Sequence, residues 1–242
     1  MEGHTCPFSA DGNGCVDIGG VTRLTAVSIN PTATLRPFVT DDRERWNEKY
    51  STDEEFELPD DPIPELRRRI DTLPTGRALD VATGTGRNAR FLAGEGYDVD
   101  AVDVSDEAID RAAQAADREG VDVNWIRSDI DDFEFERDAY DVITVSFFAA
   151  LDRIPDITAA LAPDGVLVYE HHLRSSDDID IGPSSDRYRY PSNHLLHACL
   201  GLTILHYEER TRLDDEGRTQ AVATLVGRNS TGGAQSYPQL SE

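Results

Sequence analysis

Short apolar runs alternate with stretches of helical periodicity along most of this chain. Five runs of strand type begin near positions 77, 97, 121, 140 and 166, and segments such as 87–93 and 105–116 lie between them. Two longer strand-like runs follow, joined by the turn DDEG at positions 214–217. The pattern predicts a three-layer α/β domain whose mostly parallel, seven-stranded sheet ends in an antiparallel hairpin.

The two ends of the chain differ from this pattern. Residues 1–40 hold few acids and many Gly, Ser, Thr and Pro residues, so we predict either a flexible N-terminal extension or a start codon assigned too early. We predict one domain over residues 41–228 and a disordered tail over 229–242. The extension contains His4, Cys6 and Cys15, but their spacing fits no standard zinc module and a fourth ligand is missing. We therefore assign no metal site.

The net charge of the chain indicates the salt concentration in which the protein works. The 242 residues carry a formal net charge of -24, with 47 acidic residues against 23 basic ones, of which only Lys49 is a lysine. Dense carboxylates suit molar salt, where the Debye length falls to roughly 3 Å and their repulsion is screened. The composition favours a haloarchaeal or similar source, with an acidic protein from an ordinary cell as the alternative. It also argues against a nucleic-acid partner, which needs clustered basic residues.

Three cysteines do not form a disulfide framework, and no apolar run approaches the length of a membrane span or a secretion signal. We therefore expect a cytoplasmic protein without a membrane partner. The sequence does not give its oligomeric state.

Candidate chemistry starts at the first strand, in the segment RALDVATGTGRNARFLA at positions 77–93. Gly84 and Gly86 permit a tight turn, and a helix begins directly after them. A strand, a glycine turn and a helix N-terminus together form a site for a nucleotide-like ligand. The next strand ends at Asp103, about where a carboxylate meets ribose hydroxyls.

Two cofactors compete for this pattern. Gly84, Gly86 and Ala89 satisfy the dinucleotide fingerprint, but Asp80 stands near the end of the strand, where a pyrophosphate would be repelled. S-adenosylmethionine carries no phosphate, and its sulfonium and ammonium groups are cationic. A carboxylate can hold its amino-acid part directly or through water, so the sequence favours S-adenosylmethionine.

These residues resemble the first motif of the class I S-adenosylmethionine-dependent methyltransferases, an acidic residue followed by three alternating glycines. The motif stands here as Asp80, Ala82, Gly84 and Gly86, with alanine in place of the first glycine. The sequences GRNA at positions 86–89 and WNEKY at 46–50 resemble the tellurite-resistance and thiopurine methyltransferases. The resemblance covers roughly residues 46–228 and implies the Rossmann-like methyltransferase fold.

The resemblance also implies a cofactor site. Its residues would be Trp46, Tyr50, Asp80, Ala82, Gly84, Gly86, Arg87, Asp103, Val104, Asp129, Ile130 and Ser146. Asp129 would meet the adenine amino group with Ile130 beside the ring, although Asp129 also reads as a loop carboxylate. Trp46 and Tyr50 would lie near the sulfonium, or would clamp their helix to the domain.

The acceptor side is less defined. After the fourth strand the chain reads Ser146, Phe147, Phe148, so the D/N-P-P-Y/F sequence of many nitrogen methyltransferases is missing and the phenylalanines can be core residues. A long polar loop after the fifth strand has the character of a lid. We predict a basic, aromatic acceptor pocket with the catalytic candidates His171, His172, Arg187 and Arg189.

The sequence thus predicts an enzyme that transfers a methyl group to a small molecule by in-line displacement. A hydroxyl acceptor would need a base, for which a histidine is the candidate, whereas a thiolate or a selenium or tellurium oxyanion would need only cations. Two alternatives remain open: a protein that binds S-adenosylmethionine without turnover, and a nicotinamide-dependent oxidoreductase.

Overall fold

A computed structural model gives the structure of this chain for residues 42–52, 60–214, 216–230 and 233–237. The predicted N-terminal extension, with His4, Cys6 and Cys15, lies outside the described residues. Seven strands form one sheet in the order β3-β2-β1-β4-β5-β7-β6. Strands β1 to β5 pair in parallel and β7 pairs antiparallel with both β5 and β6, which confirms the predicted sheet.

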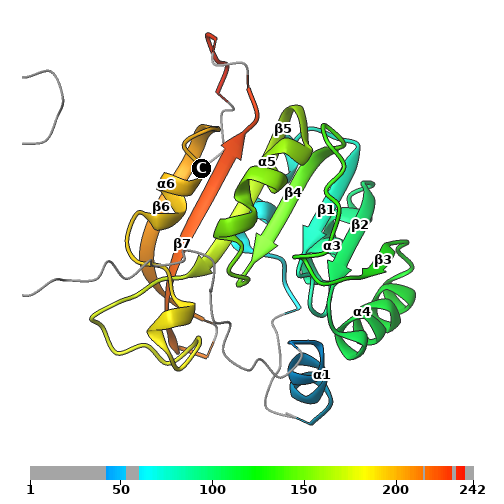
Figure 1. Ribbon diagram of the computed structural model, residues 1–242, viewed down its shortest axis with the longest axis vertical. Helices are drawn as coiled ribbons and strands as arrows, with labels where there is room; N and C mark the ends of the chain where they lie inside the picture. The colour runs from blue at the N-terminus through cyan, green and yellow to red at the C-terminus, as the bar shows by residue number, and fades with distance from the viewer. Residues whose placement is uncertain (1–41, 53–59, 215, 231–232, 238–242) are drawn as a thin grey trace, which may run out of the picture. The chain divides into compact units, whose positions relative to one another are not determined.

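The helices and strands follow the predicted order along the chain (Figure 1). They are α1 (Asp42–Thr52), α2 (Pro64–Arg69), β1 (Arg77–Val81), α3 (Arg87–Gly94), β2 (Asp98–Asp103), α4 (Asp106–Glu119), β3 (Asn124–Arg127), β4 (Tyr140–Ser146), α5 (Ile154–Ala160), β5 (Leu161–His172), α6 (His194–Ala198), β6 (Thr203–Leu213) and β7 (Thr219–Arg228). One strand-helix unit departs from the prediction, because residues 128–139 connect β3 to β4 without a helix. This connection is rich in aspartate, which favours turns over helix interiors.

Helix α4 shows how local sequence sets the element boundaries. The Ser105 hydroxyl accepts a hydrogen bond from the Ala108 backbone N–H at 3.2 Å, which caps the first turn. Gly120 ends the helix in the left-handed conformation, with φ of 72°. Ala108, Ala112 and the other buried alanines face inward, as their spacing predicts.

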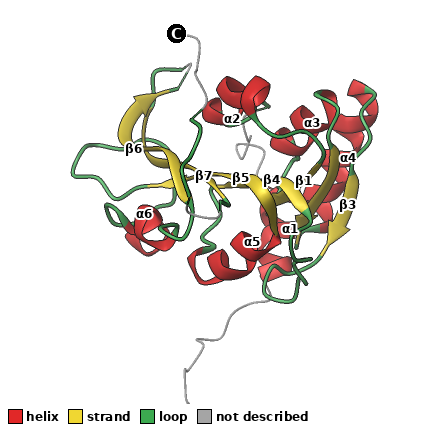
Figure 2. Cartoon of the chain, turned by 90° about the horizontal axis from the view of Figure 1, so that it is seen from above, coloured by secondary structure: helices red, strands yellow, loops and turns green. Residues whose placement is uncertain are grey.

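The core lies on both faces of the sheet. Helices α2 and α3 cover one face and α5 and α6 the other, as Figure 2 shows. On the first face Leu66 and Leu92 pack in one apolar cluster. On the second, Ile157 and Leu195 pack with Leu79 of β1 in another cluster. Because both faces are covered, the central strands are apolar over most of their length.

The parallel strands end at one common edge of the sheet. In Figure 1 the arrow of β4 points to the edge where residues 173–190 follow β5. Helix α3 begins at this same edge, directly after β1 and its glycine turn. Ligands of open parallel sheets bind at such carboxyl edges, so the fold directs the search for a site to this place.

The C-terminal hairpin closes the sheet. Gly217, with φ of 77°, occupies the turn between β6 and β7, and its N–H donates to the Asp214 carbonyl at 3.0 Å. After β7 the Asn229 side-chain amide donates to the Leu161 carbonyl at 2.8 Å. The first residue of the predicted tail thus contacts the domain, whereas residues 231–232 and 238–242 lie outside the described residues. No helix in the described part of the chain is long and apolar enough to cross a membrane.

Candidate functional site

A tight loop at residues 82–86 joins β1 to α3. Ala82, Gly84 and Gly86 all have positive φ, at 53°, 57° and 77°. The Gly86 N–H donates to the Thr83 carbonyl at 3.0 Å, which closes the turn. A Cβ atom on Gly86 would lie 2.7 Å from the Trp125 ring, so a larger residue would displace the indole. The loop therefore brings its backbone to the carboxyl edge, as the glycine pattern predicts.

Asp80 lies behind this loop. It is 1% exposed, and its carboxylate accepts hydrogen bonds from the hydroxyls of Thr83 and Thr144 at 2.5 and 2.6 Å. Burial raises the pKa of Asp80, while these donors oppose the shift. A direct contact between Asp80 and a ligand, one of the two modes that the sequence suggests, does not fit this arrangement. Asp80 instead holds the loop in position.

Asn88 is a second buried side chain that supports this loop, and it is not among the predicted site residues. Its side-chain amide donates to Asp80 at 3.4 Å and to the Ser146 hydroxyl at 3.2 Å, and its oxygen accepts from the Ile63 N–H at 3.0 Å. One side chain thus ties together β1, the end of β4 and the approach to α2. The signal in the sequence was an amide side chain two residues after the last glycine of the turn.

Asp103 holds the loop from the next strand. Its carboxylate accepts from the Gly84 N–H at 2.8 Å and from the Ser105 N–H at 2.9 Å, and the side chain is buried. Burial raises the pKa of Asp103, and the two N–H donors oppose the shift. The acid predicted to meet a ribose therefore stands beside the loop, at the end of β2.

A cavity of about 330 Å³ lies next to Asp103. It is lined by Arg43, Val104, Arg127, Ser128, Asp129 and Asp132. Two predicted site residues, Val104 and Asp129, are therefore brought together from the ends of β2 and β3. Ile130 is not in the lining, because it is buried in the apolar core. The Asp129 side chain accepts from the Asp131 N–H at 2.9 Å, which shapes the loop around the cavity.

Helix α1 is bound to the start of α4. The Asn47 side-chain oxygen accepts from the Ser105 hydroxyl at 2.7 Å, and the Arg43 guanidinium donates to Asp106 at 2.9 Å. Tyr50 is buried, and burial raises its pKa, as does the charge of Asp103. The Trp46 ring is half-buried, 6.1 Å from that of Tyr50. Tyr50 thus fits the clamp that the sequence offered as one alternative, and its place near Asp103 also fits the other.

His171 and His172 end β5 on opposite faces of the sheet. The Nε2 atom of His171 lies 3.1 Å from the Tyr188 carbonyl, and the His172 ring stacks on Phe147 with centroids 4.4 Å apart. Burial lowers the pKa of His171 to about 4 and that of His172 to about 3, the latter also through neighbouring positive charges. Both rings are therefore neutral near pH 7.

The two predicted arginines are placed differently. Arg187 is exposed and its guanidinium donates to the Tyr188 hydroxyl on the surface. Arg189 is half-buried and donates to the Pro183 carbonyl at 3.0 and 3.1 Å, and its charge acts on His172. The structure thus brings Arg189, and not Arg187, to the histidines.

The loop after β5 is anchored at both ends. The Tyr190 N–H donates to the His172 carbonyl at 2.8 Å, and the Arg174 N–H to the Tyr190 carbonyl at 2.9 Å. The Tyr190 hydroxyl lies 2.7 Å from that of Tyr169, which also accepts from the Ala150 N–H at 2.9 Å. This buried tyrosine pair, which the sequence reading missed, joins the loop to the segment after β4.

An ion pair that the sequence reading also missed lies beside this edge. Arg212 of β6 binds Glu170 of β5 through two hydrogen bonds, at 2.7 and 2.9 Å. Thr224 donates to the same carboxylate at 3.1 Å. Only the pairing of β5, β7 and β6 brings these residues together, so no sequence pattern announced them.

Residues 78–165 match the family described as methyltransferase domain. Among curated proteins, hemagglutinin 1 of Eikenella corrodens is 37% identical over 164 residues, which cover 63% of this chain and 54% of the relative. The ubiquinone biosynthesis O-methyltransferase of Actinobacillus pleuropneumoniae is 30% identical over 116 residues, covering 43% of this chain and 49% of the relative. The chain spans about half the length of these curated relatives.

Solved structures share the fold at low identity. TehB from Haemophilus influenzae aligns with a TM-score of 0.57 and 18% identity, covering 75% of this chain and 66% of TehB. An S-adenosylmethionine-dependent methyltransferase from Methanosarcina mazei gives 0.56 and 15%, covering 70% and 99%. A protein solved in work on the formation of a thioacetal group during echinomycin biosynthesis gives 0.62 and 20%, covering 79% and 94%. At these identities the likeness shows the fold.

Proposed function

We propose that this chain transfers the methyl group of S-adenosylmethionine to a small-molecule acceptor. The premise is that residues 78–165 match a methyltransferase domain. The observation that carries the proposal is the loop at 82–86, bound from behind by Asp80 and from the side by Asp103, next to a cavity of about 330 Å³. The finer assignment, to the tellurite-resistance and thiopurine subgroup, rests on GRNA and WNEKY.

The residues at the edge fit S-adenosylmethionine. Gly86 lets the loop pack closely on the domain, because a Cβ atom there would lie 2.7 Å from the Trp125 ring and 3.0 Å from the Ala112 methyl group. We assign Asp103 to the ribose hydroxyls, and Val104 and Asp129, which both line the cavity, to the adenine. When bound, S-adenosylmethionine supplies an activated methyl group on its sulfonium. The chain's own contribution is to align the acceptor and exclude water, which can supply roughly 7–11 kcal/mol in favourable cases.

The state of the histidines favours an acceptor that is already a nucleophile. A ring with a pKa of about 4 or 3 takes up a proton poorly at neutral pH, so neither His171 nor His172 is suited to deprotonate a hydroxyl. A thiolate or a selenium or tellurium oxyanion needs no base. Arg189, held beside His172, is the candidate cation among the predicted catalytic residues. Because one curated relative is named as an O-methyltransferase, phenols belong in the acceptor panel.

We also propose that the protein works in a high-salt cytoplasm, because its 47 acidic residues outnumber the 23 basic ones. Such a charge disfavours a site that binds phosphate chains through basic clusters. The proposal therefore names a small molecule as the acceptor, with no nucleic-acid or membrane partner.

Calorimetric titration in molar potassium chloride tests the function. Micromolar binding of S-adenosylmethionine and S-adenosylhomocysteine without binding of NADH is expected. Formation of S-adenosylhomocysteine in the presence of thiols, selenite or phenols then distinguishes an enzyme from a protein that binds without turnover. Binding of NADH alone would support the oxidoreductase alternative and overturn the proposal.

A further inference from the structure

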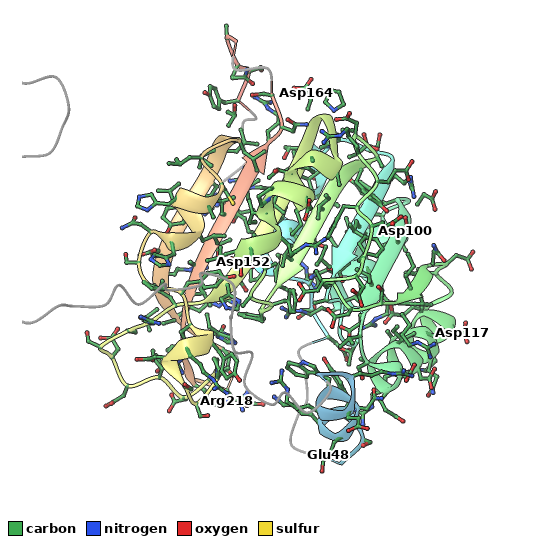
Figure 3. All side chains as sticks on the ribbon, viewed as in Figure 1. Glu48, Asp100, Asp117, Asp152, Asp164 and Arg218 are labelled. Atoms are coloured by element: carbon green, nitrogen blue, oxygen red, sulfur yellow. The ribbon has the colours of Figure 1, made fainter. Side chains whose placement is uncertain are left out.

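A second cavity lies at the edge of the sheet opposite the 82–86 loop. It has a volume of about 320 Å³, and its lining includes Asp164 and Val166 near the start of β5 and Arg228 at the end of β7. Figure 3 shows Asp164 at this edge. Arg87, one of the predicted cofactor residues, is buried at the start of α3 and therefore lies at the other, carboxyl edge.

The length of the strands separates the two edges. The seven residues of β4 span roughly 20 Å from one edge to the other. A molecule in this cavity is therefore too far from the 82–86 loop to receive a methyl group from a cofactor bound there. The cavity is distinct from any acceptor pocket at the carboxyl edge.

The lining combines apolar walls with two charges of opposite sign. Its apolar members are Leu73, Pro74, Val166 and Leu205, and its charged members are Asp164 and Arg228. Small-molecule sites enclose roughly 300–1,000 Å³, mostly between apolar side chains with a few polar groups. This cavity has such a composition, and its volume lies at the lower end of that range.

Arg228 has a donor that the described chain leaves unused. Its Nη2 atom donates to the Gln235 side-chain oxygen and to the Ser236 carbonyl, each at 2.8 Å. Both acceptors are uncharged, and no carboxylate of the described residues forms an ion pair with the guanidinium. The Nε atom is buried and has no hydrogen-bond partner in the same part of the chain. Because a buried donor without an acceptor destabilises the folded state, Arg228 is suited to bind an oxyanion.

The backbone holds Asp164 next to the end of β7. The Asp164 N–H donates to the Asn229 carbonyl at 2.7 Å, and the Asn229 N–H donates to the Gly165 carbonyl at 2.8 Å. These bonds fix the turn although Asp164 has a positive φ of 65°. Among the described residues the Asp164 carboxylate has no ion pair, with Arg228 or with another cation. Two opposite charges thus line one cavity without neutralising each other.

A β-bulge in β6 supplies one of the apolar walls. The register of β6 against β7 shifts between Ile204 and His206, which leaves Leu205 as an extra residue in the strand. β-Bulges re-aim a side chain and are common next to functional sites. Leu205 packs against the apolar cluster on this face of the sheet and lines the cavity. The irregular strand therefore directs an apolar side chain to the cavity.

We propose that this cavity binds a free α-amino acid with an apolar side chain. Its carboxylate binds the Arg228 guanidinium, its ammonium group binds Asp164, and its side chain lies against the apolar walls. A molecule of this class gives both charged groups a partner of opposite sign, whereas a simple acid or amine gives a partner to only one. The inference goes beyond the proposed function, because it concerns neither the cofactor nor the methyl acceptor.

Calorimetric titration of the full chain in molar potassium chloride, with L-leucine and two analogues, tests the proposal. The analogues are 4-methylpentanoate, which lacks the amino group, and 3-methylbutylamine, which lacks the carboxylate. L-leucine is expected to bind about tenfold more tightly than either, because each analogue leaves one charged group without its partner. Equal binding of L-leucine and 4-methylpentanoate would overturn the amino-acid assignment, and so would the absence of binding by L-leucine, L-methionine and L-valine.

Asp164→Asn removes the charge that the ammonium group needs and keeps the backbone, because asparagine tolerates the left-handed conformation. It is expected to weaken L-leucine about tenfold and to leave 4-methylpentanoate unchanged. The matched control is Asp138→Asn, because Asp138 is also exposed, has a φ of 55° and does not line the cavity. The same affinity for L-leucine in both variants would overturn the proposal.

Arg228→Gln tests the other charge. It is expected to weaken L-leucine and 4-methylpentanoate about tenfold and to leave 3-methylbutylamine unchanged. Since Arg228 also holds Gln235 and Ser236, the melting temperature of this variant is measured beside its binding. If the variant is too unstable to titrate, Asp164→Asn alone decides.

The amino-acid site and the methyltransferase function fail in different ways. S-adenosylhomocysteine is expected to bind the wild type, Asp164→Asn and Arg228→Gln equally, because its proposed site lies at the other edge. Binding of L-leucine without S-adenosylhomocysteine would overturn the methyltransferase function and support the amino-acid site. Binding of S-adenosylhomocysteine without any of the amino acids would do the reverse.

Discussion

Ala82 stands where the resembling methyltransferases carry their first glycine, and its φ of 53° is the conformation for which glycine is usual. A residue with a Cβ atom costs roughly 1–2 kcal/mol in this region of the map. The residue is half-buried, so the strain is not imposed by dense packing around the methyl group. The loop thus keeps its glycine-type shape with one glycine fewer.

Ala82→Gly is expected to stabilise the protein by about 0.5–1 kcal/mol, because relief of the strain exceeds the added freedom of glycine in the unfolded chain. Urea denaturation in molar salt measures the change. The matched control is Ala89→Gly in α3, a buried helical position, which is expected to destabilise by about 1 kcal/mol. Destabilisation by Ala82→Gly would contradict the strain argument.

The two buried histidines make a prediction about pH. Their pKa values of about 4 and 3 lie below the value of about 6.5 in an unfolded chain, so the unfolded state binds more protons at acid pH. Their contribution to stability is present above pH 6.5 and is lost as the pH falls toward 4. His172→Phe, which keeps the ring stack on Phe147, is expected to flatten this dependence.

Thermal melts from pH 7.5 to 4.5 check the prediction, by the difference between wild type and His172→Phe. His194→Gln is the control, because the His194 side chain is exposed. An unchanged pH slope in His172→Phe would contradict the burial of a neutral ring.

At the scale of elements, the carboxylate of Asp106 in α4 contacts both α1 and β3. Asp106 accepts from Arg43 of α1 at 2.9 Å and from Arg127 of β3 at 2.7 Å. These bonds lower the pKa of Asp106 to about 2, the contribution of Arg127 being the larger. Both arginines line the cavity next to Asp103. One carboxylate therefore connects α1 to the rim of the proposed adenine site.

Asp106→Asn is expected to speed hydrogen exchange of residues 42–52 and to accelerate release of S-adenosylhomocysteine, with little effect on global stability. The reason is that exposed ion pairs contribute only about 0.2–1 kcal/mol each. Asp110→Asn serves as the control, because Asp110 is an exposed residue of α4, the helix that also contains Asp106. If exchange in α1 were the same in both variants, Asp106 would not be what holds this helix.

At the scale of the whole molecule, acidic side chains are spread over many elements. Figure 3 shows Glu48 on α1, Asp117 on α4, Asp152 before α5 and Asp164 in β5, and all four are exposed. Their mutual repulsion is expected to lower stability in dilute buffer and to be screened in molar salt.

The melting temperature is therefore expected to rise steadily between 0.1 and 3 M potassium chloride. Over this range of concentration the Debye length falls from about 10 Å to below about 3 Å. A variant with those four acids changed to Asn or Gln is expected to show a weaker dependence on salt. Asp100→Asn is a contrasting change, because Asp100 is buried and bonded to Arg77, Tyr140 and Asn124. A melting temperature that falls with salt would contradict the repulsion argument.

The sequence by itself determined the order of strands and helices, the antiparallel end of the sheet and the place of the loop at 82–86. These features depend on local periodicity, turn residues and caps such as Ser105 and Gly120, which act over a few neighbouring positions. The spacing after the glycine turn also marked Asp103, and the resemblance marked Val104 and Asp129; their contacts with a cofactor stay predictions. Their positions follow from where each strand ends.

Only the tertiary structure decided which way the side chains point and what they meet. Asp80 proved to be buried behind the loop, Ile130 to lie in the core and Arg187 to lie apart on the surface. The pairing of Glu170 with Arg212 requires β5, β7 and β6 to lie side by side. Burial and partnership depend on segments far apart in the chain, so no local pattern encodes them.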